Sequence, residues 1–276
     1  MAPKYVLITG CSAGGIGHGL ALAFQKRGCA VIATARNPSK MEDLKPLPNM
    51  HLLPLDVTQE ASIAAAAKSV EAITGGRLDV LVNNAGGLYN MPILDIDIAA
   101  AKNLYDLNLW GPIRMVQTFS DMLIAARGTV VNVGSIAGVL PLPLQSIYNS
   151  SKAAINSVSE ALRYELAPFG VEVYTSLAGN VKSNIVANTA KIVVPPESKY
   201  AQLQPVFDKD PPQYSDMPTA QFCNEIADEV LAGKGGPILK GGNTWIIKWL
   251  LPIMPQFVFD RLMMANSRGL DQMPKM

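Results

Sequence analysis

Charged residues are scarce in this sequence. They make up 16% of its 276 residues, whereas an average soluble domain has about 25%. The 23 basic and 22 acidic side chains leave a net charge of +1, and no run of like charges occurs. Such a chain has no long-range field that would attract nucleic acid or an anionic bilayer. We therefore expect no nucleic-acid partner, and the 49% of hydrophobic residues leave an apolar excess to be explained.

Cysteine and histidine are also few. Cys11, Cys29 and Cys223 lie far apart and form no CxxC pair, and His18 and His51 are isolated. Neither a disulfide framework nor a metal site is indicated, so we expect no bound metal and a reducing compartment. The first apolar run has only about five residues, too short for a signal peptide or a transmembrane helix. We expect a cytoplasmic protein.

Short apolar runs alternate with segments of helical length over most of the chain. Buried parallel strands form such continuous runs because helices cover both faces of their sheet. The runs predicted to be strands are 5–8, 30–33, 52–57, 78–82, 129–133 and 171–177. We expect an α/β fold, a doubly wound parallel sheet of Rossmann type with residues 4–9 at its centre. No linker or repeat interrupts the pattern, so residues 1–276 are predicted to form a single domain.

Two segments depart from this alternation. Residues 193–218 are rich in proline and are predicted to form broken helical pieces that serve as a substrate lid. Residues 244–264 form an apolar C-terminal extension with only three charged side chains. Pro252 and Pro255 argue against a membrane-spanning helix, because the backbone groups they free would lack partners in lipid. A membrane surface, a bound lipid, the protein's own body and a second subunit all stay open as partners of this extension.

Two local motifs carry chemistry. The turn TGCSAGGIG, residues 9–17, lies between the first predicted strand and the first helix. Its glycines allow close approach to a pyrophosphate, and the helix N-terminus supplies free N–H groups. Tyr148 and Lys152 are four residues apart in the predicted helix 145–166, so they share one helix face. A nearby ammonium stabilises a phenolate and lowers the tyrosine pKa, which suits Tyr148 to acid–base catalysis.

Together these motifs resemble the classical short-chain dehydrogenase/reductase family over about residues 4–190. The turn is similar to the family's TGxxxGxG but one residue longer, and residues 83–86 read NNAG as in the family. Asp56 and Val57 resemble the pair that contacts adenine. Residues 178–183 resemble PGxVxT, with alanine and serine in place of the proline and threonine. The residues in the order of the family's catalytic tetrad are Asn108, Ser135, Tyr148 and Lys152.

The resemblance implies a role for each member of this tetrad. Tyr148 would protonate a carbonyl oxygen while a nicotinamide delivers hydride to the carbon. Ser135 would hydrogen-bond the same oxygen. Lys152 would bind the nicotinamide ribose and lower the tyrosine pKa, and Asn108 would hold a water through which the proton is replaced. The hydride chemistry itself belongs to the cofactor.

The resemblance also implies which residues contact that cofactor. They are Gly10, Ser12, Gly15, Ile16, Gly17, Asp56, Val57, Asn83, Ala85, Gly86, Tyr148, Lys152, Gly179, Val181 and Ser183. At the end of the second strand, where an NAD enzyme has an acidic residue, the chain has Ala35 and Arg36. We therefore expect NADP(H), with Thr34 and Arg36 near the 2′-phosphate.

The lengthened turn, residues 134–138 and 146–148, and the apolar extension resemble a fungal branch of the family. This branch includes acyl-dihydroxyacetone-phosphate reductases and carbonyl reductases of secondary metabolism. We expect an NADPH-dependent reductase of a lipid-like or secondary-metabolite ketone, with Tyr148 as general acid. A non-redox alternative stays open, in which NADP(H) is a scaffold for a cyclisation or isomerisation. The resemblance further implies a homodimer or homotetramer, and the segment 244–264 is a candidate for peripheral lipid contact.

Overall fold

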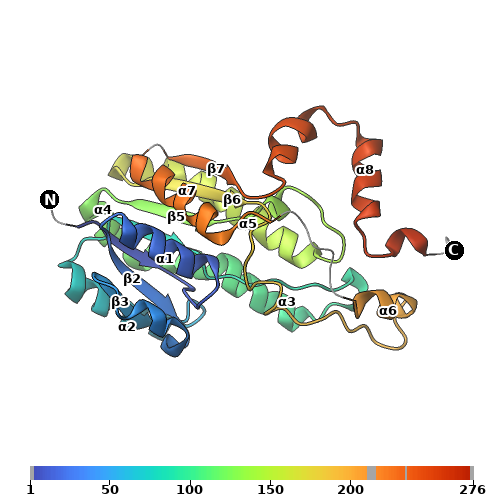
Figure 1. Ribbon diagram of the computed structural model, residues 1–276, viewed down its shortest axis with the longest axis horizontal. Coiled ribbons are helices and arrows are strands. Elements are labelled where there is room, and N and C mark those ends of the chain that lie inside the picture. The colour runs from blue at the N-terminus through green and yellow to red at the C-terminus, as the bar shows by residue number, and fades with distance from the viewer. Residues whose placement is uncertain (1–2, 210–215, 234, 274–276) are drawn as a thin grey trace.

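A seven-stranded parallel sheet forms the centre of the computed structural model, which describes residues 3–209, 216–233 and 235–273 (Figure 1). The strands are β1 (Tyr5–Ile8), β2 (Ala30–Ala35), β3 (Met50–Pro54), β4 (Val80–Asn83), β5 (Thr129–Val133), β6 (Glu172–Ala178) and β7 (Gly236–Lys240). Their order is β3-β2-β1-β4-β5-β6-β7, and all neighbouring strands are parallel. The predicted doubly wound sheet is confirmed.

Two details of the predicted sheet are wrong. The central strand is β4, and β1 lies beside it, because the unanticipated β7 lengthens the sheet on the far side of β4. The strand expected at 52–57 instead spans Met50–Pro54. Its pairing with β2 ends at Ala35 opposite Pro54, and the chain then turns so that Leu55 and Val57 become buried in the core.

Helices cover both faces of the sheet. The helices are α1 (Ile16–Lys26), α2 (Glu60–Thr74), α3 (Ile98–Tyr105), α4 (Gly111–Ala126), α5 (Ser146–Leu166), α6 (Gln204–Phe207), α7 (Thr219–Ala232) and α8 (Gln256–Ala265). Side chains alternate along each strand, so Val6 and Ile8 pack with α1 and α7 while Leu7 packs on the opposite face with α2 and α4. Figure 1 shows α1 and α7 together in front of the strands.

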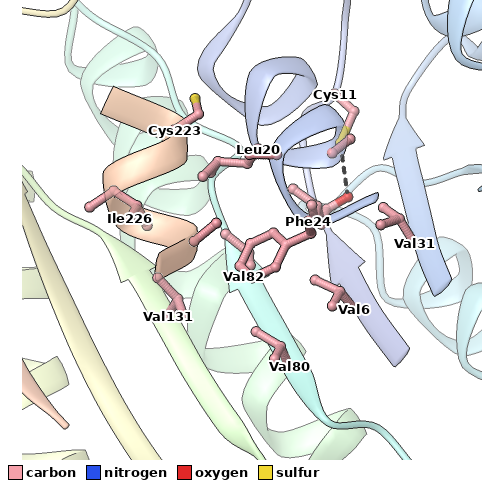
Figure 2. Close-up of a cluster of buried hydrophobic side chains, with 14 of the residues drawn as sticks. Val6, Cys11, Leu20, Phe24, Val31, Val80, Val82, Val131, Cys223 and Ile226 are labelled. Carbon is pink, nitrogen blue, oxygen red and sulfur yellow. Dashed lines mark hydrogen bonds between the residues drawn. The ribbon is translucent and has the colours of Figure 1, made fainter. Parts of the chain in front are cut away.

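The core beneath α1 and α7 brings distant parts of the chain together (Figure 2). Phe24 of α1 is fully buried there, and such burial of a large apolar side chain contributes about 1.5–3 kcal/mol. A methyl group on Gly19 would lie 2.7 Å from Cys223 Sγ, so glycine is needed for α7 to approach α1 this closely. Burial raises the thiol pKa of both Cys11 and Cys223 to about 12. These cysteines are packing residues.

The proline-rich segment and the C-terminal end lie outside this sheet-and-helix body. The predicted lid, 193–218, contains a 3₁₀ turn (Ala201–Leu203) followed by α6, and its residues 210–215 lie outside the described part of the chain. After β7 the chain leaves the body, forms α8 and returns to the neighbourhood of α6 (Figure 1). Within the described ranges, no helix has the length and apolarity needed to cross a bilayer.

Candidate active site

The glycine-rich turn is fastened to the neighbouring strand by Asn84. The Asn84 side-chain amide donates to the carbonyl oxygens of Thr9 (2.8 Å) and Gly10 (3.1 Å). In return, the Thr9 hydroxyl accepts from the backbone N–H groups of Asn84 (3.0 Å) and Ala85 (2.9 Å). Gly10 has φ +75°, and a methyl group there would lie 2.9 Å from Ala85 Cα. The turn therefore requires glycine at position 10 for both conformation and space.

The end of this turn is the N-terminus of α1. Gly15 is the N-cap residue, and among the described residues no side chain caps it. The first N–H groups of a helix have no partner inside the helix, and together with the helix dipole they attract an anion. Ser12, Gly15, Ile16 and Gly17 all lie on this stretch, where a pyrophosphate would meet the backbone.

The loop that follows β6 contacts the glycine-rich turn. The Asn184 side chain donates to the Ala13 carbonyl oxygen at 3.0 Å. At the base of this loop, Gly179 packs so closely against the backbone of residues 241–242 that no side chain fits. Val181 and Ser183 lie between these two points and are half-buried. The loop that carries these three predicted residues is thus joined to the glycine turn through Asn184.

The end of β2 carries Thr34 and Arg36, which are predicted to lie near a 2′-phosphate. Arg36 is exposed there, as an arginine that meets a phosphate must be. Thr34 is fully buried, however, and its hydroxyl donates to the Ile8 carbonyl oxygen at 2.9 Å. Its own carbonyl oxygen accepts from Cys11 N–H at 2.8 Å. The hydrogen-bonding groups of Thr34 hold the turn against β2, so its hydroxyl already has a partner within the protein.

Asp56 and Asn83 also have partners within the protein. The Asp56 carboxylate accepts from the Thr58 N–H (3.0 Å) and hydroxyl (2.8 Å). Asn83 is buried, and its amide donates to Asn132 Oδ1 at 2.9 Å. Asn132 in turn donates to Ser159 on α5 at 3.0 Å. Asn83 thus links β4, β5 and α5. The NNAG motif, residues 83–86, therefore contributes to the site mainly through the three residues that follow Asn83.

Asn108 is held in a π-helical turn, Asp106–Trp110, between α3 and α4. Its Oδ1 accepts from Gly87 N–H at 2.9 Å, and its Nδ2 donates to the Gly87 carbonyl oxygen (3.0 Å) and to Ser151 Oγ (3.1 Å). A methyl group on Gly86 would lie 3.2 Å from Asn108 Oδ1 and 3.7 Å from Lys152 Nζ. The end of β4, the π-turn and α5 therefore meet at one point. Local π-helical geometry of this kind is frequent at functional sites.

Tyr148, Lys152 and Ser135 lie together at the N-terminal part of α5. The Tyr148 hydroxyl is hydrogen-bonded to Ser135, and Lys152 Nζ lies 5.9 Å from the centre of the Tyr148 ring. Lys152 Nζ donates to the Val133 carbonyl oxygen at 2.9 Å, at the end of β5. The helical spacing of four residues has placed both side chains on one face, as predicted.

Burial acts on the two groups in opposite directions. It raises the pKa of Tyr148, an effect that the hydrogen bond from Ser135 partly offsets. It lowers the pKa of Lys152 to about 8. In each case a low-dielectric environment disfavours the charged form. Desolvation of the phenol therefore raises the pKa of Tyr148, where the sequence led us to expect a lowering by Lys152.

Sequence reasoning missed three residues that support this arrangement. Asn156 donates to the Ser135 carbonyl oxygen at 3.1 Å, and Ser151 joins Asn108 to the Tyr148 carbonyl oxygen. Asn184 bridges the two loops. A signal was available for Asn156, because it follows Lys152 by four residues and so lies on the same helix face. None was available for Asn184, whose partner is 171 residues away.

A parallel sheet with a glycine turn, a Tyr–Lys pair and a serine at its carboxyl edge defines a Rossmann-type oxidoreductase. The short chain dehydrogenase family model matches residues 4–192, more than half of the chain. The chain belongs to this family.

Similar proteins of known sequence cover almost the whole chain. It is 44% identical over 264 residues to the short-chain dehydrogenase ptmH of Penicillium ochrochloron, covering 94% of this chain and 96% of that one. It is 38% identical over 238 residues to an NADPH-dependent 1-acyldihydroxyacetone phosphate reductase of Schizosaccharomyces pombe, covering 85% and 80%. The fungal branch expected from the sequence is thus represented among its relatives.

Solved structures of bacterial short-chain dehydrogenases have the same fold. One from Streptomyces avermitilis is 26% identical with a TM-score of 0.76, and the match covers 98% of both chains. Another from Burkholderia cenocepacia, in complex with NADP, is 26% identical with a TM-score of 0.74, covering 94% of this chain and 97% of that one.

Proposed function

We propose that the protein is an NADPH-dependent reductase of apolar ketones, with Tyr148 as general acid. The observation that carries this proposal is the junction of Gly86, Asn108 and Lys152, beside the hydrogen bond between Ser135 and Tyr148. Bound NADPH supplies the hydride in such a reduction.

The residues present fit NADP(H). The uncapped N-terminus of α1 suits a pyrophosphate, and Arg36 is exposed at the end of β2 with Ala35 rather than an acid before it. The relative from Schizosaccharomyces pombe is named an NADPH-dependent reductase, and the Burkholderia neighbour was solved with NADP. In this proposal Arg36 binds the 2′-phosphate, and the loop carrying Gly179, Val181 and Ser183 covers the nicotinamide end.

Each tetrad residue then has a defined task. Tyr148, kept protonated by burial, donates its proton to the carbonyl oxygen. Ser135 hydrogen-bonds the same oxygen and orients it. Lys152 binds the ribose through its ammonium, and Asn108 holds the water through which the Tyr148 proton is replaced. General acid catalysis of this kind contributes about 10²–10⁴ to a rate.

An apolar substrate is supported by a cavity on the neighbouring face of α5, whose wall includes Asn149 and Ala153, the residues that directly follow Tyr148 and Lys152. The cavity has a volume of about 510 Å³, and Leu140, Leu142 and Leu144 form part of its wall. Tyr200 of the lid contributes another part of the wall. Cavities of this size accommodate drug-sized molecules. A lipid-like or secondary-metabolite ketone suits both the lining and the fungal relatives.

The loss of NADPH absorbance with a panel of alkyl and aryl ketones tests the function. We expect oxidation of NADPH with at least one apolar ketone, and a fall of 10²-fold or more in Tyr148→Phe. NADPH binding, followed by fluorescence, should be nearly unchanged in that variant, since the ring remains. Binding without oxidation across the panel would favour the non-redox scaffold instead, and equal turnover in Tyr148→Phe would exclude Tyr148 as the acid.

We also propose a lipid-surface contact for the C-terminal extension. Trp245, Trp249, Ile253 and Phe257 are each more than half exposed. The Lys248 ammonium lies 5.0 Å from the Trp249 ring. Exposed indoles beside cations are typical of segments that insert at the boundary of an anionic lipid layer. The free thiols of all three cysteines support a cytoplasmic site for this contact.

A homodimer or homotetramer is the final part of the proposal. Exposed large side chains lie just before α4 and on α5, namely Trp110, the N-cap residue of α4, and Tyr164 near the end of α5. Phe169, just beyond α5, is also more than half exposed. Aromatic side chains are enriched where subunits meet.

A further inference from the structure

The end of the described chain is fastened to the lid by Arg268. Its Nη2 donates to the carbonyl oxygens of Val206 (3.2 Å), Phe207 (3.2 Å) and Lys209 (2.8 Å). These carbonyls lie at or just beyond the end of α6, where helix carbonyls have no partner further along the helix. A cation at this end is favoured by the hydrogen bonds that it donates to these carbonyls.

The fit around Arg268 is close. Its guanidinium lies 5.8 Å from the centre of the Phe207 ring, and Phe207 is 2% exposed. The next residue, Gly269, has φ +94°, and a methyl group there would lie 3.3 Å from Leu203 Cδ2. Residues 266–273, called the tail below, thus contact α6 and the turn before it. The Arg268 guanidinium meets the Phe207 ring, and Gly269 meets Leu203.

From α6 the contacts continue to the catalytic part of the chain. Phe207 and Leu203 belong to a buried cluster that includes Leu144 and packs against Leu270 of the tail. Leu144 lies four residues before Tyr148, and its carbonyl oxygen accepts from Met91 N–H at 2.8 Å. The tail is therefore connected through the lid to the loop that precedes Tyr148.

The same elements form the walls of the substrate cavity. Tyr200 from the lid and Leu270 from the tail line it, as do Leu142 and Leu144 from the loop before Tyr148. A displacement of the lid relative to the tail would move two of these walls at once. We propose that Arg268 is a positioning residue for substrate binding, which fastens the lid to the tail and so sets the affinity for bulky apolar ketones. This inference rests on the proposed function.

A comparison of KM for large and small ketones tests this role. In Arg268→Ala we expect KM for a long-chain ketone to rise at least tenfold, with kcat changed less than twofold. KM for a three- or four-carbon ketone, too small to touch the lid, should change less than twofold, as should NADPH affinity. Arg261→Ala, an exposed position on α8, is the matched control. Arg268→Lys, which keeps the charge, should restore part of the affinity.

Limited trypsin digestion gives a readout that does not depend on turnover. The lid offers exposed Lys199 and Lys209, and exposed Lys191 lies just before it; cleavage after these lysines should accelerate at least tenfold in Arg268→Ala but not in Arg261→Ala. If Arg268→Ala does not fold, Gly269→Ala, strained by its positive φ, replaces it and should accelerate the same cleavages. Unchanged cleavage together with unchanged KM would overturn the proposal. Unchanged KM with faster cleavage would also overturn it, since the lid would then be loosened without consequence for substrate.

Failure of the two proposals can be told apart. If no ketone oxidises NADPH in the unmodified protein, the proposed reductase function fails, and a positioning role for a ketone fails with it. Trypsin cleavage would still show in that case whether Arg268 fastens the lid. If the unmodified protein reduces ketones and Arg268→Ala behaves like it in every assay, only the role of Arg268 is excluded.

Discussion

At the scale of single residues, burial shifts the pKa values of both Tyr148 and Lys152. A raised tyrosine pKa keeps the phenol protonated at neutral pH, which is the form that a proton donor needs. With a pKa of about 8, the Lys152 ammonium is still largely charged at pH 7 and becomes neutral as the pH rises through 8. In the proposed function, burial therefore favours reduction near neutral pH, where Tyr148 is protonated and the Lys152 ammonium is still largely charged.

Arg36 is the residue on which the choice of cofactor depends in the proposed function. Arg36→Ala should weaken NADPH binding at least tenfold, because a hydrogen bond to a charged group contributes about 1.5–3 kcal/mol. NADH binding should change less than twofold, since NADH has no 2′-phosphate. Fluorescence titration with both cofactors measures this ratio, and Lys45→Ala, at an exposed cation nine residues further along the chain, is the control. An equal loss for both cofactors would contradict a contact with the 2′-phosphate.

At the scale of elements, α5 carries side chains of the candidate active site, and α8 carries exposed apolar surface. The 21 residues of α5 present Tyr148, Lys152 and Asn156 to the site, with Ser159 anchoring the helix to the buried amides of the sheet. By contrast, α8 has no buried residue. It stands away from the sheet (Figure 1). The chain is attached to the rest of the protein before α8, at β7, and after it, at Arg268. Such a helix depends on a partner to cover its apolar side chains.

The proposed partner of this segment is tested with lipid vesicles. The protein should cosediment with vesicles of mixed phosphatidylcholine and phosphatidylglycerol, and replacing both Trp245 and Trp249 by serine should weaken binding at least tenfold, because two large apolar side chains no longer insert. Trp110→Ser is the matched control, since Trp110 is half exposed but lies at the start of α4. Vesicle binding that is absent, or that depends equally on Trp110, would contradict the lipid contact.

At the scale of the whole molecule, the scarcity of charge has several causes. The sheet is buried on both faces, so its strands contain almost no charge. A further share of the apolar surface lies outside the core, on residues 245–264 and at the outer edges of α4 and α5. A chain with a net charge of +1 has little self-repulsion to keep copies apart. Both observations are consistent with the proposed self-association.

Light scattering on a size-exclusion column tests this association. One chain has a mass of 29.5 kDa, so the proposed dimer or tetramer would have two or four times that mass. Tyr164→Glu at the exposed end of α5 should shift the particle toward one chain, because a buried unpaired carboxylate is costly at an interface. Lys68→Glu, at a charged position on α2, controls for the added charge. A single-chain mass for the unmodified protein would exclude the oligomer.

The features predicted well were those set by neighbours in the sequence. The continuous apolar run of β1, the glycine turn and the spacing of Tyr148 and Lys152 are local patterns, and the structure has each of them in its expected place. Thr34 was expected near the cofactor from its position at the end of a strand, and Asn83 from the NNAG motif. Their side chains bond to Ile8 and Asn132 on adjacent strands. Strand pairing decided this, and pairing is not visible in a linear pattern.

The sequence by itself determined the class of fold and the common helix face of Tyr148 and Lys152, because apolar runs and helical spacing act over a few residues. Only the tertiary structure decided the position of β7, which extends the sheet beyond β6, and the contact of Asn184 with Ala13. It also decided that Arg268 meets the end of α6, some 60 residues earlier in the chain. These contacts depend on how the sheet and its two covering layers bring distant segments together, and no local preference of the chain encodes that.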